Sequence, residues 1–174
     1  MKTTLRLFGL LLILIYQPSS GQSIPRMAFT VTMENPGEHR FHVSLTCDGV
    51  SGENLNFKLP AWTPGYYQLL NFADNVENFS VTDKNKNALP WEKINRNMWR
   101  VKNTKAKSLL ITYDVKTTRS FVATCYLDEE RGYIMPAGVF MHLEGKLNQP
   151  STITIDPNAW HNVATGLDSV AGKK

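Results

Sequence analysis

The feature that most constrains the fold of this chain is a recurring alternation of apolar and polar side chains. In residues 40–47 every second position from Phe41 to Cys47 is apolar, and residues 27–33 and 108–117 repeat the pattern. Successive side chains of a β-strand point to opposite faces, so each segment would bury one face and expose the other. A shift of one residue would turn the apolar set toward water, and the register is therefore tightly specified.

Short segments of this kind, separated by turns, continue along the chain. Strong turn signals lie at residues 35–38, 83–87 and 128–132, and no apolar period of 3.6 residues runs far enough for a long helix. This pattern predicts an all-β domain, an antiparallel β-sandwich or a saddle-like pair of sheets. The predicted strands cover residues 27–33, 40–47, 54–59, 79–82, 98–101, 108–117, 121–127, 138–143, 151–155 and 160–164.

Residues 1–21 have the layout of a secretory signal peptide. Lys2 and Arg6 precede an apolar run over residues 7–16, and Pro18 and small residues follow it. That run of ten residues is about half the length that a membrane-spanning helix needs. We therefore expect cleavage after Gly21, a mature domain over residues 22–174, a periplasmic or extracellular location, and no membrane association apart from export.

The charge of the chain argues against nucleic acid as a partner. The formal net charge of +4 falls to +2 once Lys2 and Arg6 leave with the leader. The basic stretches at residues 84–87 and 102–107 are short, and they are more typical of solvated turns than of phosphate contacts.

Cys47 and Cys125 are the two cysteines of the chain. Export would place them in an oxidising compartment, where a disulfide between them is allowed. Each also fits the apolar face of a predicted strand, where a free buried thiol is common. The sequence leaves both interpretations open.

No segment carries a convincing catalytic centre. His39 and His42 are three residues apart, which on a strand places them on opposite faces, and His142 and His161 are isolated. The chain has no His-Glu-x-x-His motif and no cysteine pair with zinc spacing. The acidic stretch of residues 128–130 fits a solvated hairpin turn. We therefore expect no catalytic residue, metal ligand or cofactor in this chain.

The segment Leu-Pro-Ala-Trp-Thr-Pro-Gly-Tyr-Tyr-Gln at residues 59–68 is the most distinctive stretch. Turns usually carry small polar residues, whereas this one holds Trp62, Tyr66 and Tyr67 around Pro64 and Gly65. The aromatics could form an exposed platform for a sugar or a peptide. We expect instead a buried plug at the end of the sandwich, because an exposed cluster of this kind would be adhesive.

Residues 54–67, followed by Asn-Val-Glu-Asn-Phe-Ser-Val at residues 75–81, resemble the N-terminal domain of the glycyl aminopeptidase family, the PDZ-containing zinc metallopeptidases. The resemblance spans roughly residues 29–167. Weaker similarities follow in the same order: Trp99-Arg100-Val101, Tyr113-Asp114-Val115, Arg131-Gly132-Tyr133, Pro157-x-x-Trp160 and Ala164-Thr165-Gly166-Leu167.

The resemblance implies a β-rich N-terminal domain that is followed in the family by a thermolysin-like zinc domain and a PDZ domain. The family removes N-terminal glycine or small residues from peptides. No zinc ligand or catalytic glutamate of the family has a counterpart here, so zinc is implied only for a catalytic domain that this chain lacks.

Two hypotheses about function follow. In the first, the chain is a secreted, non-catalytic β domain, apparently truncated at its C-terminal end, whose partner is a metallopeptidase catalytic domain in cis or in trans. Residues 62–67 would then lie at the interface or in the core, near the peptide substrate. In the second, the chain is a stand-alone glycan- or peptide-binding module that uses the same aromatics.

Overall fold

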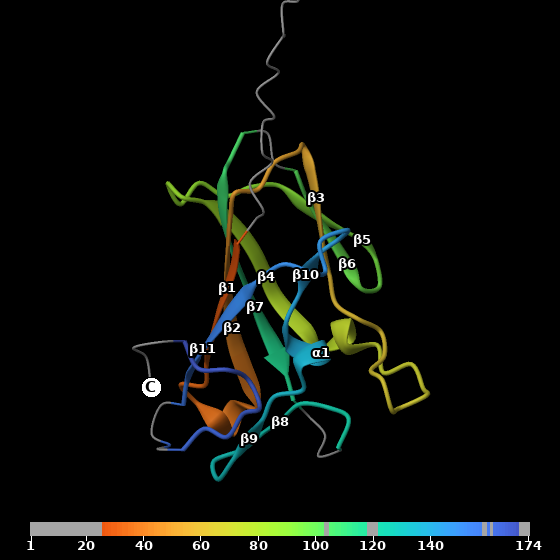
Figure 1. Cartoon of the computed structure of the whole chain (residues 1–174), viewed down its shortest axis with the longest axis vertical. Helices are drawn as coiled ribbons and strands as arrows, with labels where there is room; N and C mark the ends of the chain where they lie inside the picture. Colours follow the sequence, from red (N-terminus) through yellow and green to blue (C-terminus); the bar gives the residue numbers. More distant parts are fainter. Residues whose placement is uncertain (1–25, 103–104, 118–121, 158–159, 161, 171–174) are drawn as a thin grey trace, which may run out of the picture.

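Two sheets share one hydrophobic core in the computed structural model, which describes residues 26–102, 105–117, 122–157, 160 and 162–170 (Figure 1). All their strand pairs are antiparallel except the parallel pair of β1 and β11. The larger sheet has the strand order β11-β1-β2-β7-β4, and the smaller has the order β10-β3-β6-β5. A two-stranded ribbon, β8–β9, completes the β structure. The expected all-β, two-sheet architecture is confirmed, and the predicted signal peptide lies outside the described residues.

The strands follow the predicted alternation closely where the sequence pattern is clear. Strands β1 and β2 form an antiparallel hairpin, and β2 pairs along its whole length with β7. The bounds in the larger sheet are β1 (Arg26–Thr32), β2 (Arg40–Asp48), β4 (Val76–Asp83), β7 (Ser108–Lys116) and β11 (Ser151–Asp156). In the smaller sheet and the ribbon they are β3 (Asn54–Lys58), β5 (Trp91–Asn95), β6 (Met98–Lys102), β10 (His142–Leu143), β8 (Tyr126–Leu127) and β9 (Gly132–Tyr133).

Short helices occupy three connections. These are the 3-10 turns η1 (Pro36–Glu38) and η2 (Phe72–Asn75) and the single-turn helix α1 (Pro136–Val139). None of the helices in the described ranges is long and apolar enough to cross a bilayer.

The core lies between the two sheets and is rich in aromatic side chains. Phe79 of β4 stacks on Trp99 of β6, with ring centroids 5.5 Å apart, and it also lies 6.4 Å from the ring of Tyr113. The Tyr113 hydroxyl donates a 2.6 Å hydrogen bond to the carbonyl of Val139, which ties helix α1 to the larger sheet. Burial raises the pKa of this phenol, so it stays neutral.

Three of the predicted strands are wrong in whole or in part. Residues 122–124 form a turn and a bend, so of the described part of the strand predicted over residues 121–127 only the end is extended, as β8. The segment 138–143 begins in α1, because Pro136 suits the first turn of a helix, and only its end is the strand β10. The described residues of the strand predicted over residues 160–164, which are 160 and 162–164, do not form a strand.

Candidate functional site

The base of the aromatic bend, residues 59–71, is fixed to the smaller sheet. Leu59 is fully buried, its N–H donates to the carbonyl of Asn97 at 3.0 Å, and its own carbonyl accepts from Asn97 Nδ2 at 3.0 Å. The carbonyl of Ala61 then accepts two bonds from the returning chain, from the N–H groups of Leu70 at 2.8 Å and Asn71 at 3.1 Å. The two arms of the bend are therefore closed on each other by backbone hydrogen bonds.

The tip of the bend is a tight turn. The N–H of Tyr66 donates to the carbonyl of Thr63 at 3.2 Å, with Pro64 and Gly65 between them. Gly65 has φ of +86°, and a Cβ added there would meet nothing within 4 Å. Glycine is needed here for its backbone conformation rather than for space, and the Pro-Gly order is the one that a type II turn favours.

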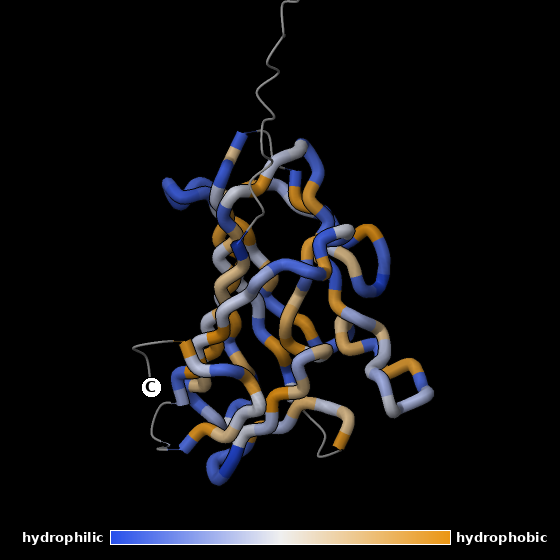
Figure 2. The backbone as a smooth tube through the Cα atoms, in the orientation of Figure 1, coloured by the Kyte–Doolittle hydropathy of each residue, from blue (hydrophilic) through white to orange (hydrophobic). Residues whose placement is uncertain are grey.

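The side chains of the bend are largely exposed. Trp62 is 50% exposed, Tyr67 is 93% exposed, and Leu69, which the sequence interpretation did not single out, is 71% exposed. The expectation that Trp62, Tyr66 and Tyr67 form a buried plug is therefore wrong, although Tyr66 is half-buried. Figure 2 shows the bend projecting from the body of the molecule, with a hydrophobic stretch along it.

The physical reason lies in what anchors the bend. Its two ends insert Leu59 and Phe72 into the interior, and both are buried. A Cβ on Gly138 of α1 would lie 3.1 Å from the ring of Phe72, so helix and ring are already in close contact. With these anchors filling the end of the sandwich, no space is left inside for the tip, and Trp62 remains outside.

Next to the bend, Asp74 of η2 pairs with Arg96. Arg96 Nε donates to Asp74 Oδ1 at 2.8 Å and to Oδ2 at 3.1 Å, and its Nη2 also contacts Oδ2. The hydrogen bond from Arg96 lowers the pKa of Asp74. The pair is solvent-exposed, so it orients the η2 turn beside the bend and adds little to stability.

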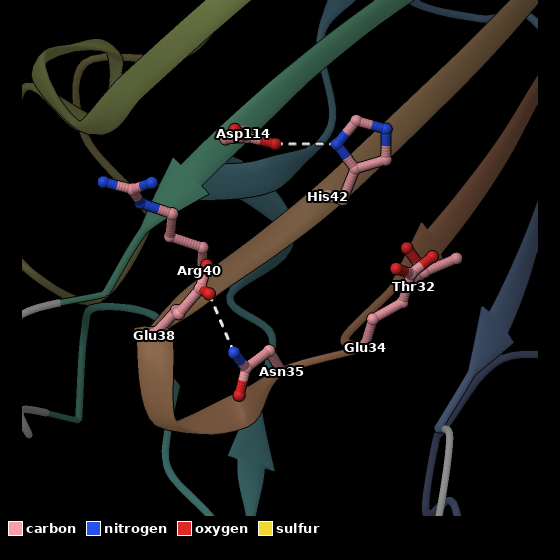
Figure 3. Close-up of a pocket in the computed structure, with 7 residues that line it drawn as sticks. All are labelled: Thr32, Glu34, Asn35, Glu38, Arg40, His42 and Asp114. Atoms are coloured by element: carbon pink, nitrogen blue, oxygen red, sulfur yellow. Dashed lines mark hydrogen bonds and ion pairs between the residues drawn. The ribbon is translucent and has the colours of Figure 1, made fainter.

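A separate cavity of about 340 Å³ lies on the outer face of the larger sheet (Figure 3). It is lined by Thr32, Glu34, Asn35, Glu38, Arg40, His42 and Asp114. His42 Nδ1 donates to Asp114 Oδ1 at 2.7 Å, and Asn78 Nδ2 donates to Asp114 Oδ2 at 2.6 Å. Burial raises the pKa of Asp114, but these hydrogen bonds outweigh it and hold the pKa below its usual value.

The cavity offers hydrogen-bonding groups but no assembled nucleophile. Thr32 lies directly across from His42 in the sheet, yet Thr32 Oγ1 is buried and makes no hydrogen bond. Arg40 Nε is likewise buried without a partner. The arrangement could hold a small polar solute, and no base activates a hydroxyl in it.

The remaining histidines do not gather. His39 lies in the turn before β2, where its Nδ1 donates to the carbonyl of Leu127 at 2.6 Å, whereas His42 lies on β2 and bonds Asp114. His142 lies on β10, where burial lowers its pKa, and His161 falls outside the described residues. The described part of the chain contains no group of three or more His, Cys, Asp or Glu side chains that could hold a metal ion. The described residues therefore offer no ligand set for the zinc that the family resemblance assigns to a catalytic domain.

The sequence left open whether Cys47 and Cys125 are bridged, and the structure has both as free, buried thiols. Burial raises the pKa of Cys47 to about 12 and that of Cys125 to about 11. The reactive form of cysteine is the thiolate, and burial disfavours that form in both residues.

The acidic stretch at residues 128–130 is a hairpin turn, as expected. Asp128 accepts hydrogen bonds from the N–H groups of Glu130 and Arg131 at 2.9 and 2.8 Å, which closes the β8–β9 ribbon. Trp160 packs on this ribbon: its Nε1 donates to the carbonyl of Glu129 at 3.2 Å, and its ring lies 3.0 Å from the position of a Cβ on Gly132. The two late motifs of the family resemblance, around Gly132 and Trp160, thus meet in space.

Comparison with known families matches residues 28–174 to the Peptidase M61 N-terminal domain. The chain belongs to this family. The match includes residues of both sheets, the aromatic bend and the late Trp160 contact, so it covers nearly all of the described residues.

One solved structure supports the fold of the M61 domain. An aminopeptidase N family protein from Idiomarina loihiensis is similar with a TM-score of 0.72 and 24% identity, over 76% of this chain and 22% of that chain. An M1 zinc metallopeptidase from Deinococcus radiodurans aligns with a TM-score of 0.42 and 14% identity, over 78% of this chain and 32% of that chain. No curated protein sequence matches this chain. The M61 domain thus spans about a fifth of the length of the Idiomarina protein.

Proposed function

We propose that this M61 domain is the non-catalytic N-terminal part of a secreted, glycyl-aminopeptidase-like metallopeptidase. In this proposal the aromatic bend docks against the catalytic domain and helps to wall the cleft that receives the peptide. The catalytic domain supplies the zinc ligands and the general base, and the M61 domain supplies a fixed surface.

One observation carries the proposal: the bend is rigidly built and yet exposes its large side chains. Its arms are closed by the bonds to the Ala61 carbonyl, and its tip is fixed by the Pro64-Gly65 turn. The side chains of Trp62, Tyr67 and Leu69 are nevertheless exposed to solvent. Contiguous exposed apolar side chains on an ordered element are typical of a surface that another domain covers, and Trp and Tyr are frequent anchors of such interfaces.

The test requires the peptidase that carries this domain, so reading the gene beyond the Lys174 codon comes first. A His-Glu-x-x-His helix encoded there supports the cis form of the proposal. In that longer protein, hydrogen exchange of the amides of residues 61–71 should be slower than in the 174-residue chain, because docking excludes water from the bend. Equal exchange in the two proteins would contradict docking at this site.

Activity gives a second measurement. In the longer protein, replacing both Trp62 and Tyr67 with alanine should raise KM for glycyl-p-nitroanilide while the zinc content stays at one ion per chain. Leu147→Ala is the matched control, because Leu147 is also a large exposed apolar residue but lies in the loop between β10 and β11. An equal effect of both variants would show that the bend has no special role.

The exposure of Trp62 and Tyr67 also favours a second candidate, a stand-alone module that binds glycans or peptides. Here the two rings would form a stacking platform in the isolated chain. Saturable binding of a chitooligosaccharide or a glycyl peptide by the 174-residue chain, abolished by Tyr67→Ala, would support this candidate. Binding that needs the catalytic domain would reject it.

A further inference from the structure

Two polar atoms in the cavity of the larger sheet are buried and lack a hydrogen-bond partner. They are the hydroxyl oxygen of Thr32 and the Nε of Arg40, and no described residue bonds either of them. Both residues line the cavity of about 340 Å³ that Figure 3 shows. Buried polar groups are nearly always paired in folded proteins, and this cavity has far more room than one water molecule needs. The Arg40 N–H needs an acceptor, whereas the Thr32 hydroxyl can take either a donor or an acceptor.

The charge of the lining decides which kind of solute fits. The described residues that line the cavity include three carboxylates, those of Glu34, Glu38 and Asp114. Arg40 carries the one guanidinium among them, which leaves a formal charge of −2 when His42 is neutral. Such a cavity attracts cations and repels carboxylates and phosphates. The described part of the chain has no group of three His, Cys, Asp or Glu side chains that could hold a metal ion, so an organic cation fits best.

Two of the carboxylates are held in place by neighbouring side chains. Glu38 Oε1 accepts from Asn35 Nδ2 at 2.7 Å. Asp114 accepts from His42 at 2.7 Å and from Asn78 at 2.6 Å. A carboxylate has about four lone-pair sites, so each can accept further hydrogen bonds from an ammonium group.

The backbone fixes the separation of the two unpaired atoms. Thr32 of β1 pairs directly with His42 of β2, and Arg40 lies two residues away from His42 on the same face of β2. One strand spacing and two residues place the Cα atoms of Thr32 and Arg40 about 8 Å apart. In an amino acid residue, the α-nitrogen and the carbonyl oxygen are three covalent bonds apart, and a hydrogen bond at each end extends this span to about 9 Å. A single such unit can therefore bridge the two atoms.

We propose that this cavity binds an α-ammonium group together with the carbonyl of the same residue, the combination found at the N-terminus of a peptide and in an amino-acid amide. The ammonium donates to the Thr32 hydroxyl and to the Glu38 carboxylate, and the carbonyl accepts from Arg40 Nε. The positive charge of the ligand offsets part of the negative charge of the lining. A free amino acid fits less well, because its own carboxylate lies beside those of the cavity.

This site is separate from the aromatic bend. The cavity lies on the outer face of the larger sheet, whereas the bend is fixed to the smaller sheet through Leu59 and Asn97. The inference requires no catalytic domain and is tested on the 174-residue chain alone. Its outcome is therefore independent of the proposed function.

The first experiment tests the chemistry of the ligand with small probes. The isotope-labelled chain is titrated, and the NMR chemical shifts of the backbone amides are followed at constant ionic strength. Glycinamide carries both groups, glycine adds a carboxylate, and N-acetylglycinamide lacks the ammonium. We expect saturable shifts within residues 32–42 for glycinamide, binding about tenfold weaker for glycine, and no saturation for N-acetylglycinamide. No saturable shift with glycinamide, or equal binding of N-acetylglycinamide, would overturn the proposal.

The second experiment tests the residues. Thr32→Val removes the hydroxyl and keeps the branched shape, so glycinamide should bind at least about tenfold more weakly. The matched control is Thr30→Val, because Thr30 lies on the same face of β1, is exposed and is not among the residues that line the cavity. Thr32→Val should not lower the thermal unfolding temperature, because the buried hydroxyl has no hydrogen bond to lose. Unchanged binding in folded Thr32→Val, or an equal loss in Thr30→Val, contradicts the site.

A longer probe distinguishes the two sources of the ligand group. Glycyl-glycyl-glycinamide presents the same ammonium and carbonyl at the N-terminus of a peptide. Binding as tight as that of glycinamide assigns the cavity to peptide N-termini, whereas loss of binding restricts it to single amino-acid derivatives. In either case the probe that binds must bind more weakly to Thr32→Val, and a probe that binds equally to both chains counts against the proposal.

Discussion

Two tryptophan side chains of this M61 domain differ in their environment: one is buried in the core and the other is half-exposed at the surface. Trp99, on β6, is 2% exposed and stacks on Phe79 beneath the larger sheet. Trp62, in the bend, is 50% exposed. Hydrophobicity alone does not decide which indole is buried. The element that carries the side chain decides it.

The two elements reach stability in different ways. Strand β6 pairs with β3 and β5 on its two sides, and it buries the side chains of Trp99 and Val101 in the shared core. The bend is closed by its own backbone hydrogen bonds at Ala61 and by its tight turn, and it inserts only its ends into the core. A loop that is stabilised in this way can leave its apolar residues free for a partner.

The largest effect is expected for Trp99→Ala. Removing this buried ring leaves a cavity beside Phe79 and should lower the free energy of unfolding by about 3–5 kcal/mol. Urea denaturation followed by circular dichroism measures the change. Trp99→Phe is the control, because it keeps a ring in the stack and should cost clearly less. A loss no greater than that of an exposed residue would show that the stack does not hold the two sheets together.

A smaller effect is expected for Tyr113→Phe. The change leaves the ring in the core but removes the donor to the Val139 carbonyl at 2.6 Å, and an unsatisfied buried carbonyl costs about 1–3 kcal/mol. Tyr126→Phe is the control, because the Tyr126 hydroxyl bonds Asp128 at the surface ribbon. The same denaturation experiment compares the two. Equal losses would mean that the bond to α1 contributes nothing beyond a surface contact.

The sequence alone was sufficient to predict the strands that have one apolar face and one polar face. Strands β2 and β7 alternate cleanly, and their predicted bounds agree with the structure to within a residue. Strand β5 was not predicted, because it is an edge strand with four of its five residues exposed and so carries no alternation. The second half of helix α1 was predicted as part of a strand over residues 138–143, because its apolar residues form too short a run to reveal a period.

The sequence found the bend but not the environment of its side chains. The Pro64-Gly65 turn could be predicted from the sequence, because the Pro-Gly order favours a turn in which the glycine adopts a positive φ, as Gly65 does. The exposure of Trp62 could not be predicted from the sequence, because it depends on Leu59 and Phe72 filling the end of the core. Such competition for interior space is a property of the packed chain and leaves no local pattern.

The smallest effect on stability is expected for Trp62→Ala, although the residue removed is as large as Trp99. Substitutions at exposed positions without special contacts usually change the free energy of unfolding by less than about 0.5 kcal/mol, and Trp62 should behave in this way in the isolated chain. The measurement is the same urea titration, with Leu147→Ala as a second exposed residue.

The comparison becomes sharper when Trp62→Ala is repeated in the longer peptidase. If the catalytic domain covers the bend, the indole is buried there, and its removal should lower the stability of the longer protein more than that of the isolated domain. The difference between the two losses then measures what docking adds at this side chain. A large loss already in the isolated chain would mean that Trp62 supports the fold itself, and the contrast between the two indoles would disappear.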